Sequence, residues 1–428
     1  MAETDTNTTP SLRRLLGPWD LTALGVNQVI GGAIFLVPAT LALQLGSWSW
    51  LAVGCIGLLS MAVALNFAEA GSRFDGTGGP YLYARSAFGR FVSFEVGWMT
   101  WFTRVSSWAT VVNGFADALG FYWPGIRSGV SRVTLISSVV LVIMGLNIRG
   151  IKQSSFAINL LTVGKLVPLT IFMLAGFAHF SFGRLAPGAF PSLQQLPAAA
   201  LLLIFTFGGY EVIPVPAGEA RDPRRDVPFA MITAIIVVTI VFMLVQMVSL
   251  ATFPDLAWSK TPLADASLLL LGSWGALMMT AGTSVSMAGN NVGAALSGSR
   301  SLFALAEQHD VPRIFAHINQ RFRTPDAAIV FTCLATLGVA LSGSFSSLAP
   351  VSALARLVIY TSTCAAVLAL RRKSRAPFTI PGGPVVPVVA LAVCVAILLG
   401  ATSAQLQAGG KALAAGALLY LIARLTRK

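Results

Sequence analysis

Two pairs of glycines, Gly31 with Gly32 and Gly208 with Gly209, interrupt long apolar stretches of this 428-residue chain. Glycine lets a helix open, and an opened helix leaves backbone N–H and C=O groups without partners. The N–H groups of the helix that begins after Gly32 suit a carboxylate, because they lie at the positive end of the helix dipole. The carbonyls that end the helix near Phe207 suit an ammonium. Together the two breaks predict a site for a zwitterion, and close packing of helices at glycine is the alternative interpretation.

The composition places these breaks inside a membrane. Hydrophobic residues make up 55% of the chain, charged residues make up 11%, and the mean hydropathy is +0.77. Soluble domains contain about 25% charged residues, so the chain is expected to be an all-α polytopic membrane protein. A helix broken at membrane depth survives only where the open backbone lines a polar cavity. The breaks therefore predict a binding site near the middle of the bilayer.

Runs of about 20 apolar residues predict twelve transmembrane helices. They are expected at 20–43, 48–70, 91–118, 132–147, 156–178, 196–217, 227–252, 272–304, 325–343, 347–370, 384–402 and 408–425. The broken spans are the first and the sixth. Because five spans separate equivalent points, the second half enters the membrane from the opposite side, which predicts a 5+5 inverted repeat followed by two extra helices.

The positive charges predict the orientation, because Lys and Arg stay on the cytoplasmic side of a membrane. Of the 29 Lys and Arg residues, 21 fall in the alternate loops that include both chain ends, five fall in the opposite loops, and three lie within spans. Both termini are therefore expected in the cytoplasm, and this topology explains the net charge of +13. No basic patch with interleaved aromatic residues is present, so no nucleic-acid partner is expected. The polar first 17 residues suggest no removable signal peptide, so the first span is expected to direct insertion.

The residues that most often hold metals or perform catalysis are sparse and poorly spaced. The four cysteines lie in apolar segments and the three histidines lie in or near loops, without metal-type spacing: Cys55, Cys333, Cys364, Cys394, His179, His309 and His317. No phosphate-binding loop, dinucleotide fingerprint or catalytic triad is visible. The sequence therefore predicts neither an enzyme nor a metal or cofactor site.

Five motifs, in their usual order, resemble one transporter family. GVNQVIGGAIFLVP at 25–38 resembles the family's broken first helix, with departures at Asn27, Gly32 and Ala33, and FTFGGYE with the following GEARDPRRDVP resembles its broken sixth helix. GGPYLYARSAFG at 78–89, the segment 297–312 and PFTIPGGPVVP at 377–387 are the other three. The chain resembles the amino acid permeases of the amino acid-polyamine-organocation superfamily, which have the LeuT-type fold, along nearly its whole length.

The resemblance implies a single transporter domain over 1–428, with a first repeat at 19–178, a second at 196–370 and two extra helices at 380–425. It also implies the substrate-binding groups. The backbone N–H groups of Gly31, Gly32 and Ala33 would bind the substrate carboxylate. The carbonyls of Phe205, Thr206 and Phe207, next to Gly208, would bind the ammonium. Ile30, Phe207 and Tyr210 would shape the side-chain pocket.

Lys165 is a lysine at membrane depth, which is costly and therefore a functional candidate. Its motif LLTVGKLVP resembles the T-A-G-K-L of related transporters, in which the lysine stands where sodium binds in sodium-coupled relatives. The resemblance implies hydrogen bonds to carbonyls near Gly25 and around Ala288 and Gly289. Proton coupling and a purely structural role are both open at this stage, because amino acid exchangers also have this lysine.

Four other polar residues are accessory candidates. Arg104 lies close to where cationic amino acid transporters of the family have a glutamate, which argues against a cationic substrate and allows an acidic one. An arginine paired inside the protein is the alternative interpretation. Glu211 follows the second break and is expected to orient the helix. Asn290 and Asn291, in the eighth span, could bind polar substrate groups or neighbouring backbone.

By this resemblance the chain is expected to be a secondary transporter of the inner (plasma) membrane that moves an amino acid by alternating access. A neutral substrate and linkage to protons are favoured. The alternatives are an exchanger and a transporter of an acidic amino acid or an amine. A channel or a nutrient sensor is disfavoured, because the chain shows neither a continuous polar stripe nor a sizeable soluble domain. Glu69 and Glu219, at the expected cytoplasmic ends of spans, are expected to form gating or packing networks. The oligomeric state does not follow from the sequence.

Overall fold

The structure is a computed structural model that describes residues 11–192, 195–342, 345–400 and 403–425. Helices dominate these residues, and the extended pairing among them is one isolated bridge between Leu16 and Ala220. The α-helices are α1 (Pro18–Val29), α2 (Ala33–Leu45), α3 (Ser49–Gly71), α4 (Pro80–Phe88), α5 (Arg90–Tyr122), α6 (Gly129–Arg149), α7 (Ile151–Ala178), α8 (Gln195–Phe207), α9 (Pro223–Thr252), α10 (Pro262–Glu307), α11 (Asp326–Leu341), α12 (Phe345–Arg371), α13 (Val385–Leu399) and α14 (Ser403–Leu425). Short 3-10 helices join several of them: η1 (Gly46–Trp48), η2 (Pro124–Ile126), η3 (Phe182–Leu185), η4 (Tyr210–Val212), η5 (Ala217–Glu219), η6 (Leu256–Trp258) and η7 (Arg313–Ala316).

Eight stretches of the described residues are long and apolar enough to cross a membrane. They are Ala33–Gly71, Gly129–Arg149, Ile151–Ala178, Gln195–Val212, Pro223–Thr252, Pro262–Glu307, Leu354–Arg371 and Leu406–Leu425. The expected all-helical membrane architecture is confirmed at this level. Each of the twelve expected spans overlaps a helix, including the shorter apolar helices α11 and α13. Positions 343 and 401–402 of the expected spans lie outside the described residues.

Both expected helix breaks are present. The first apolar stretch is divided into α1 and α2 by a bend over residues 30–32. In the sixth, α8 ends at Phe207, and turns and the short η4 and η5 follow instead of a continued helix. Gly209 has a φ of +136°, a backbone conformation that residues with a side chain rarely adopt. Glycine at this position therefore lets the chain leave the helix.

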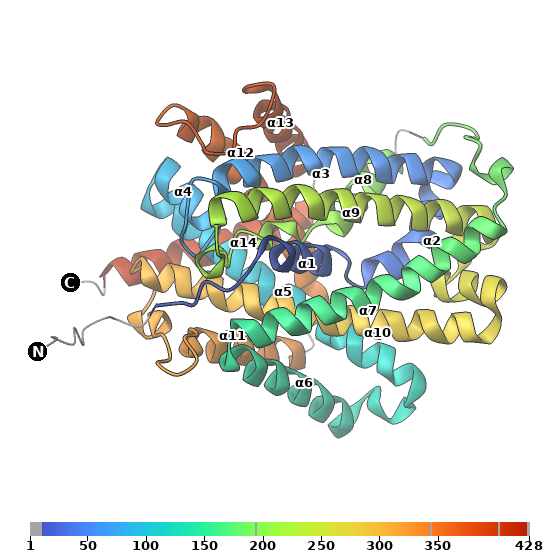
Figure 1. The fold of residues 1–428 in the computed structure, drawn as a ribbon, viewed down its shortest axis with the longest axis horizontal. Helices are drawn as coiled ribbons and strands as arrows, with labels where there is room; N and C mark the ends of the chain where they lie inside the picture. Colours follow the sequence, from blue (N-terminus) through green and yellow to red (C-terminus); the bar gives the residue numbers. More distant parts are fainter. Residues whose placement is uncertain (1–10, 193–194, 343–344, 401–402, 426–428) are drawn as a thin grey trace, which may run out of the picture.

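The long helices run side by side along the molecule, and the short α1 lies in the middle of them (Figure 1). α1 packs against α7, α9, α10 and η4. Small residues allow this close approach, as is common in membrane proteins. A Cβ added at Gly25 would meet the Ile213 side chain at 2.4 Å, and one added at Gly293 would meet the Gln28 amide at the same distance. The first break is therefore surrounded by other helices.

Ion pairs join distant segments of the chain at one end of the molecule. The segment before α1, the helix α4 and the end of α14 lie together there (Figure 1), and we refer to this as the terminal end. At this end Arg300 donates two hydrogen bonds to Glu219, and both side chains are fully buried. Arg371 contacts Glu69, and Asp310 contacts Arg85 and Arg90. The loops and helices of the terminal end are thus tied to one another.

Candidate functional site

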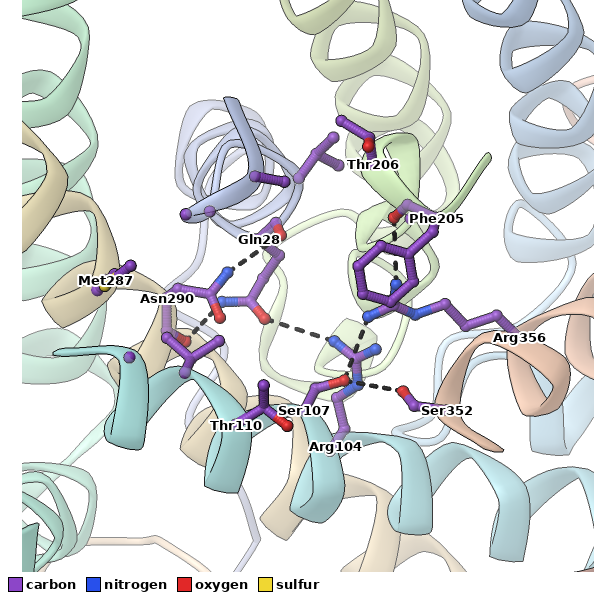
Figure 2. A pocket seen from close by; sticks show the side chains of 17 residues that line it. Gln28, Arg104, Ser107, Thr110, Phe205, Thr206, Met287, Asn290, Ser352 and Arg356 are labelled. Atoms are coloured by element: carbon purple, nitrogen blue, oxygen red, sulfur yellow. Dashed lines mark hydrogen bonds between the residues drawn. The ribbon is translucent and has the colours of Figure 1, made fainter. Parts of the chain in front are cut away.

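A cavity of about 260 Å³ lies between the two breaks. This is close to the lower end of the range for small-molecule sites, roughly 300–1,000 Å³. Figure 2 shows that its lining comes from the first break, α5, the end of α8, α10 and α12. The lining residues are Gln28, Val29, Gly31, Gly32, Ala33, Arg104, Ser107, Thr110, Val111, Gly114, Phe205, Thr206, Gly208, Met287, Asn290, Ser352 and Arg356.

The carbonyls that end α1 are already paired with side chains. Ser286 donates to the carbonyls of Ile30 and Gly31, at 3.0 Å each. Asn290 donates to the Gln28 carbonyl at 3.1 Å, and the Gln28 amide donates back to the Asn290 carbonyl at 2.9 Å. The acceptors at the first break are therefore used to hold α1 against α10.

The donors at the first break are positioned differently. The Gly31 N–H donates to the Val29 carbonyl at 2.8 Å, so it is engaged, although the sequence placed it in the carboxylate cradle. α2 begins at Ala33, and the first N–H groups of a helix have no intrahelical acceptor. Gly32 and Ala33 also line the cavity. The start of α2 therefore offers the cavity N–H groups and the positive end of a helix dipole.

The second break is held by Glu211, just after it. Its Oε2 accepts a hydrogen bond from the Gly209 N–H at 2.7 Å and another from the Tyr360 hydroxyl at 2.9 Å. Its Oε1 accepts one from Arg104 at 2.8 Å. This carboxylate thus fixes the turn, as the sequence suggested, and joins it to α5 and α12.

Arg356 reaches the same break from α12. Its Nε lies 3.3 Å from Glu211 Oε1, and its terminal nitrogens donate to the Phe205 carbonyl at 3.4 Å and to the Ser107 hydroxyl at 3.3 Å. The guanidinium also lies over the Phe205 ring, 5.2 Å from its centroid. Figure 2 shows Arg104 and Arg356 converging on the side of the cavity near Phe205 and Ser107. Two guanidinium groups and one carboxylate therefore meet at this wall.

Lys165 lies behind the first break and is absent from the cavity lining. The side chain is fully buried, and its ammonium donates to the carbonyls of Asn27 at 3.0 Å, Ile30 at 2.6 Å and Ser286 at 3.2 Å. These acceptors lie on the first and eighth expected spans, close to the positions expected from the resemblance. A protonated lysine has three N–H donors, so this contact satisfies all of them and ties α7 to α1 and α10.

The structure divides the predicted site residues into two groups. Those that line the cavity are Gly31, Gly32, Ala33, Arg104, Phe205, Thr206, Gly208 and Asn290. Those that do not are Ile30, Lys165, Phe207, Tyr210, Glu211 and Asn291. Phe207 packs edge-on against Phe242, and Tyr210 stacks on Tyr360. These two rings therefore pack on neighbouring helices behind the break. The family resemblance had implied that they shape the side-chain pocket.

The other lining residues were not predicted from the sequence: Gln28, Val29, Ser107, Thr110, Val111, Gly114, Met287, Ser352 and Arg356. Arg356 had a signal in the sequence, because it is one of three basic residues inside expected spans. Ser107 and Thr110 follow Arg104 at helical spacing, which places them on one face of α5. Neither pattern alone indicates which face meets the break.

The comparison with known proteins decides the family. Residues 16–422 match the family described as amino acid permease. The chain belongs to the amino acid permease family. An uncharacterized transporter of Mycobacterium tuberculosis is 27% identical over 419 residues, which cover 97% of this chain and 92% of the relative. The serine/threonine exchanger SteT of Bacillus subtilis is 28% identical over 407 residues, 89% of each chain. The branched-chain amino acid permease BcaP of Bacillus subtilis is 26% identical over 419 residues, 91% of this chain and 88% of the relative.

Membership in the amino acid permease family fixes the broad class of the protein. It is a transporter rather than an enzyme, and its substrate is a small molecule of the amino acid class. The apolar helices agree with a multi-pass integral membrane protein. The described residues contain no group of three or more His, Cys, Asp or Glu side chains placed to hold a metal ion.

Proposed function

We propose that this amino acid permease is a secondary transporter that binds its substrate in the cavity between the two helix breaks. One observation supports this most strongly: the cavity is lined by the start of α2, which offers N–H groups, and by the end of α8, which offers carbonyls. A carboxylate suits the first and an ammonium suits the second. Gly32 and Ala33 bind the carboxylate, and the carbonyls of Phe205 and Thr206, which line the cavity, are the acceptors for the ammonium.

The protein crosses the inner (plasma) membrane twelve times, with both termini in the cytoplasm. The segments 19–178 and 196–370 form two inverted repeats, and 380–425 adds two helices outside them. The positions of the two breaks and the distribution of Lys and Arg support this topology. The terminal end then faces the cytoplasm, where buried ion pairs close it in this conformation.

The cavity is reached from the side opposite the terminal end. On α5, the lining residues Ser107, Val111 and Gly114 are partly exposed, whereas Thr100 and Thr103, nearer to the start of the helix, are buried. Alternating access then requires α1 and the segment after α8 to move as a pair. This movement closes the cavity and separates the pairs at the terminal end.

Transport is linked to protons through Lys165. The three carbonyls around its ammonium hold the protonated form in this conformation. Movement of α1 away from α7 removes two of them, those of Asn27 and Ile30, which favours release of the proton. Exchange is the second candidate mode, because the relative SteT is named an exchanger.

Counterflow in proteoliposomes tests the proposed function. Vesicles are loaded with one unlabelled amino acid at a time, and entry of the same labelled amino acid is measured. We expect at least one amino acid to enter faster than in protein-free vesicles. If no amino acid or amine enters, the proposed function is wrong.

A pH gradient tests the role of Lys165. We expect an acidic exterior to accelerate uptake by the wild-type protein, and we expect uptake by Lys165→Ala to be independent of the gradient. Lys152→Ala is the matched control, because Lys152 is an exposed lysine on the same helix. Full pH dependence in Lys165→Ala would remove the lysine from the proton step.

A further inference from the structure

The charges at the cavity do not balance. Among the described residues that line it, the two charged ones are both arginines, Arg104 and Arg356. The carboxylate that contacts them is Glu211, which lies behind the lining. One positive charge is left over in a buried site at membrane depth, where an unpaired charge is costly. The cavity therefore favours a ligand with a negative charge of its own.

The imbalance falls mainly on Arg356. Glu211 Oε1 accepts from Arg104 at 2.8 Å, and Oε2 is occupied by the Gly209 N–H and the Tyr360 hydroxyl. The three contacts of Arg356 with polar atoms are 3.3–3.4 Å long. Typical N–H···O bonds measure about 2.7–3.2 Å. Arg104 is thus held by Glu211, whereas the terminal nitrogens of Arg356 are weakly engaged at the cavity wall.

The position of Arg356 also bears on the ammonium of the substrate. One of its terminal nitrogens donates to the Phe205 carbonyl, an acceptor at the end of α8. This carbonyl also accepts from the Gly208 N–H at 3.1 Å. A carboxylate in the cavity that pairs with the guanidinium frees the second acceptor position of the carbonyl for an ammonium. A substrate with an anionic side chain therefore gains two contacts: its side-chain carboxylate pairs with Arg356, and its ammonium reaches the Phe205 carbonyl. A neutral side chain offers no group that draws the guanidinium away.

Building on the proposed function, we propose that the transported amino acid has an acidic side chain, and that the guanidinium of Arg356 binds its carboxylate. Guanidinium and carboxylate pair through two parallel hydrogen bonds. The ion pair of Arg104 and Glu211 stabilises the part of the cavity wall next to Arg356. From the sequence, a neutral substrate was favoured and an acidic one was an alternative. The presence of Arg356 in the cavity lining is the reason that we now favour the acidic substrate.

Isosteric pairs of substrates provide the test. Glutamate and glutamine have nearly the same shape, as do aspartate and asparagine, and the members of each pair differ in charge. In counterflow by the wild-type protein, we expect the KM of at least one acid to be lower than that of its amide by about tenfold or more, since charge-assisted bonds are the stronger ones. Arginine and ornithine should not compete.

Variants of Arg356 test the residue. In Arg356→Gln the preference for the acid over its amide should disappear, chiefly through a rise in the KM of the acid, so that the ratio of the two KM values falls toward one. Arg356→Lys should keep part of the preference. Arg184→Gln is the control, because Arg184 is an exposed arginine outside the expected spans. Thermal unfolding and gel filtration check that each variant is folded.

The outcomes separate the inference from the proposed function. If the wild-type protein moves an amide with a KM equal to or lower than that of the acid, the proposal of an acidic substrate is wrong, but the proposed transporter function is not contradicted. If folded Arg356→Gln loses transport of the acid and of the amide to the same extent, the assignment of the side-chain carboxylate to Arg356 is wrong. If Arg356→Gln does not fold, Arg356→Lys decides the residue, and unchanged selectivity in that variant contradicts the assignment. If no amino acid moves at all, the proposed function itself has failed.

Discussion

Gly209 is one of the residues at which the two broken segments touch. A Cβ added to it would lie 2.7 Å from the carbonyl carbon and oxygen of Gln28. These are backbone atoms, which cannot move aside as the end of a flexible side chain could. α1 ends at Val29, the next residue along the chain. The break after α8 is therefore packed directly on the break after α1, and this contact holds the two ends of the cavity at a fixed separation.

Gly209→Ala should destabilise the protein strongly. The positive φ of Gly209 strains any residue with a side chain by about 1–3 kcal/mol, and the contact with Gln28 adds to this. We expect a lower Tm in detergent and loss of transport. Gly145→Ala is the control: this exposed glycine of α6 has open space where a Cβ would be, so its Tm should stay the same or rise slightly. An unchanged Tm in Gly209→Ala would contradict the role given to the contact.

At the scale of elements, the terminal end is closed by contacts between segments far apart in the chain. Glu219 in η5 and Arg300 in α10 are both fully buried and joined by two hydrogen bonds, at 2.9 Å and 3.0 Å. Glu69 at the end of α3 pairs with Arg371 at the end of α12. Because η5 follows the second break, the pair with Arg300 ties the mobile part of the proposed mechanism to a long helix.

Glu219→Gln should show how much this closure contributes. Removing one partner of a buried ion pair leaves an uncompensated charge and costs about 3–5 kcal/mol, so the Tm should fall markedly. Asp75→Asn is the matched control, because it breaks a pair with Arg224 whose side chains are largely exposed, and it should leave the Tm unchanged. Equal effects of the two variants would mean that the buried pair does not hold the terminal end.

One face of α5 forms a wall of the cavity, and cysteine labelling tests this placement. Val111 lines the cavity, and the neighbouring Val112 is fully buried. Val111→Cys should react with a membrane-impermeant thiol reagent, and the transported amino acid should slow the reaction. Val112→Cys should not react above the background of the wild-type protein, which has Cys55 exposed. Labelling of both positions at the same rate would contradict this orientation of α5.

At the scale of the whole molecule, the sequence predicted what depends on local pattern. Apolar runs indicated the helices, because backbone groups in lipid must be paired within the helix, and glycine pairs indicated both breaks. The contribution of Arg356 and Ser107 to the same wall as Phe205 was not predicted. That wall forms only when α5, α8 and α12 pack together, and no periodicity within one segment contains this information. The family resemblance placed Tyr210 and Phe207 in the side-chain pocket, yet neither residue lines the cavity.

The donors and acceptors of the first break were also predicted only in part. Their number follows from the sequence, because every opened helix turn exposes them. Their partners do not, since Lys165, Ser286 and Asn290 lie 135 residues or more away in the chain from the carbonyls they bind. The structure shows that most carbonyls at this break hold α1 in place. Gly32 and Ala33, at the start of α2, line the cavity.

We propose that an amino acid passes through the cavity between the breaks. Counterflow of labelled amino acids by the wild-type protein and by Gly32→Val tests this proposal, because Gly32 lines the cavity and a Cβ added to it would meet the Met287 side chain at 2.8 Å. Gly145→Val, on the exposed face of α6, is the control. We predict counterflow in the wild-type and control proteins and none in folded Gly32→Val. Counterflow by Gly32→Val at the wild-type rate and KM would contradict the proposal.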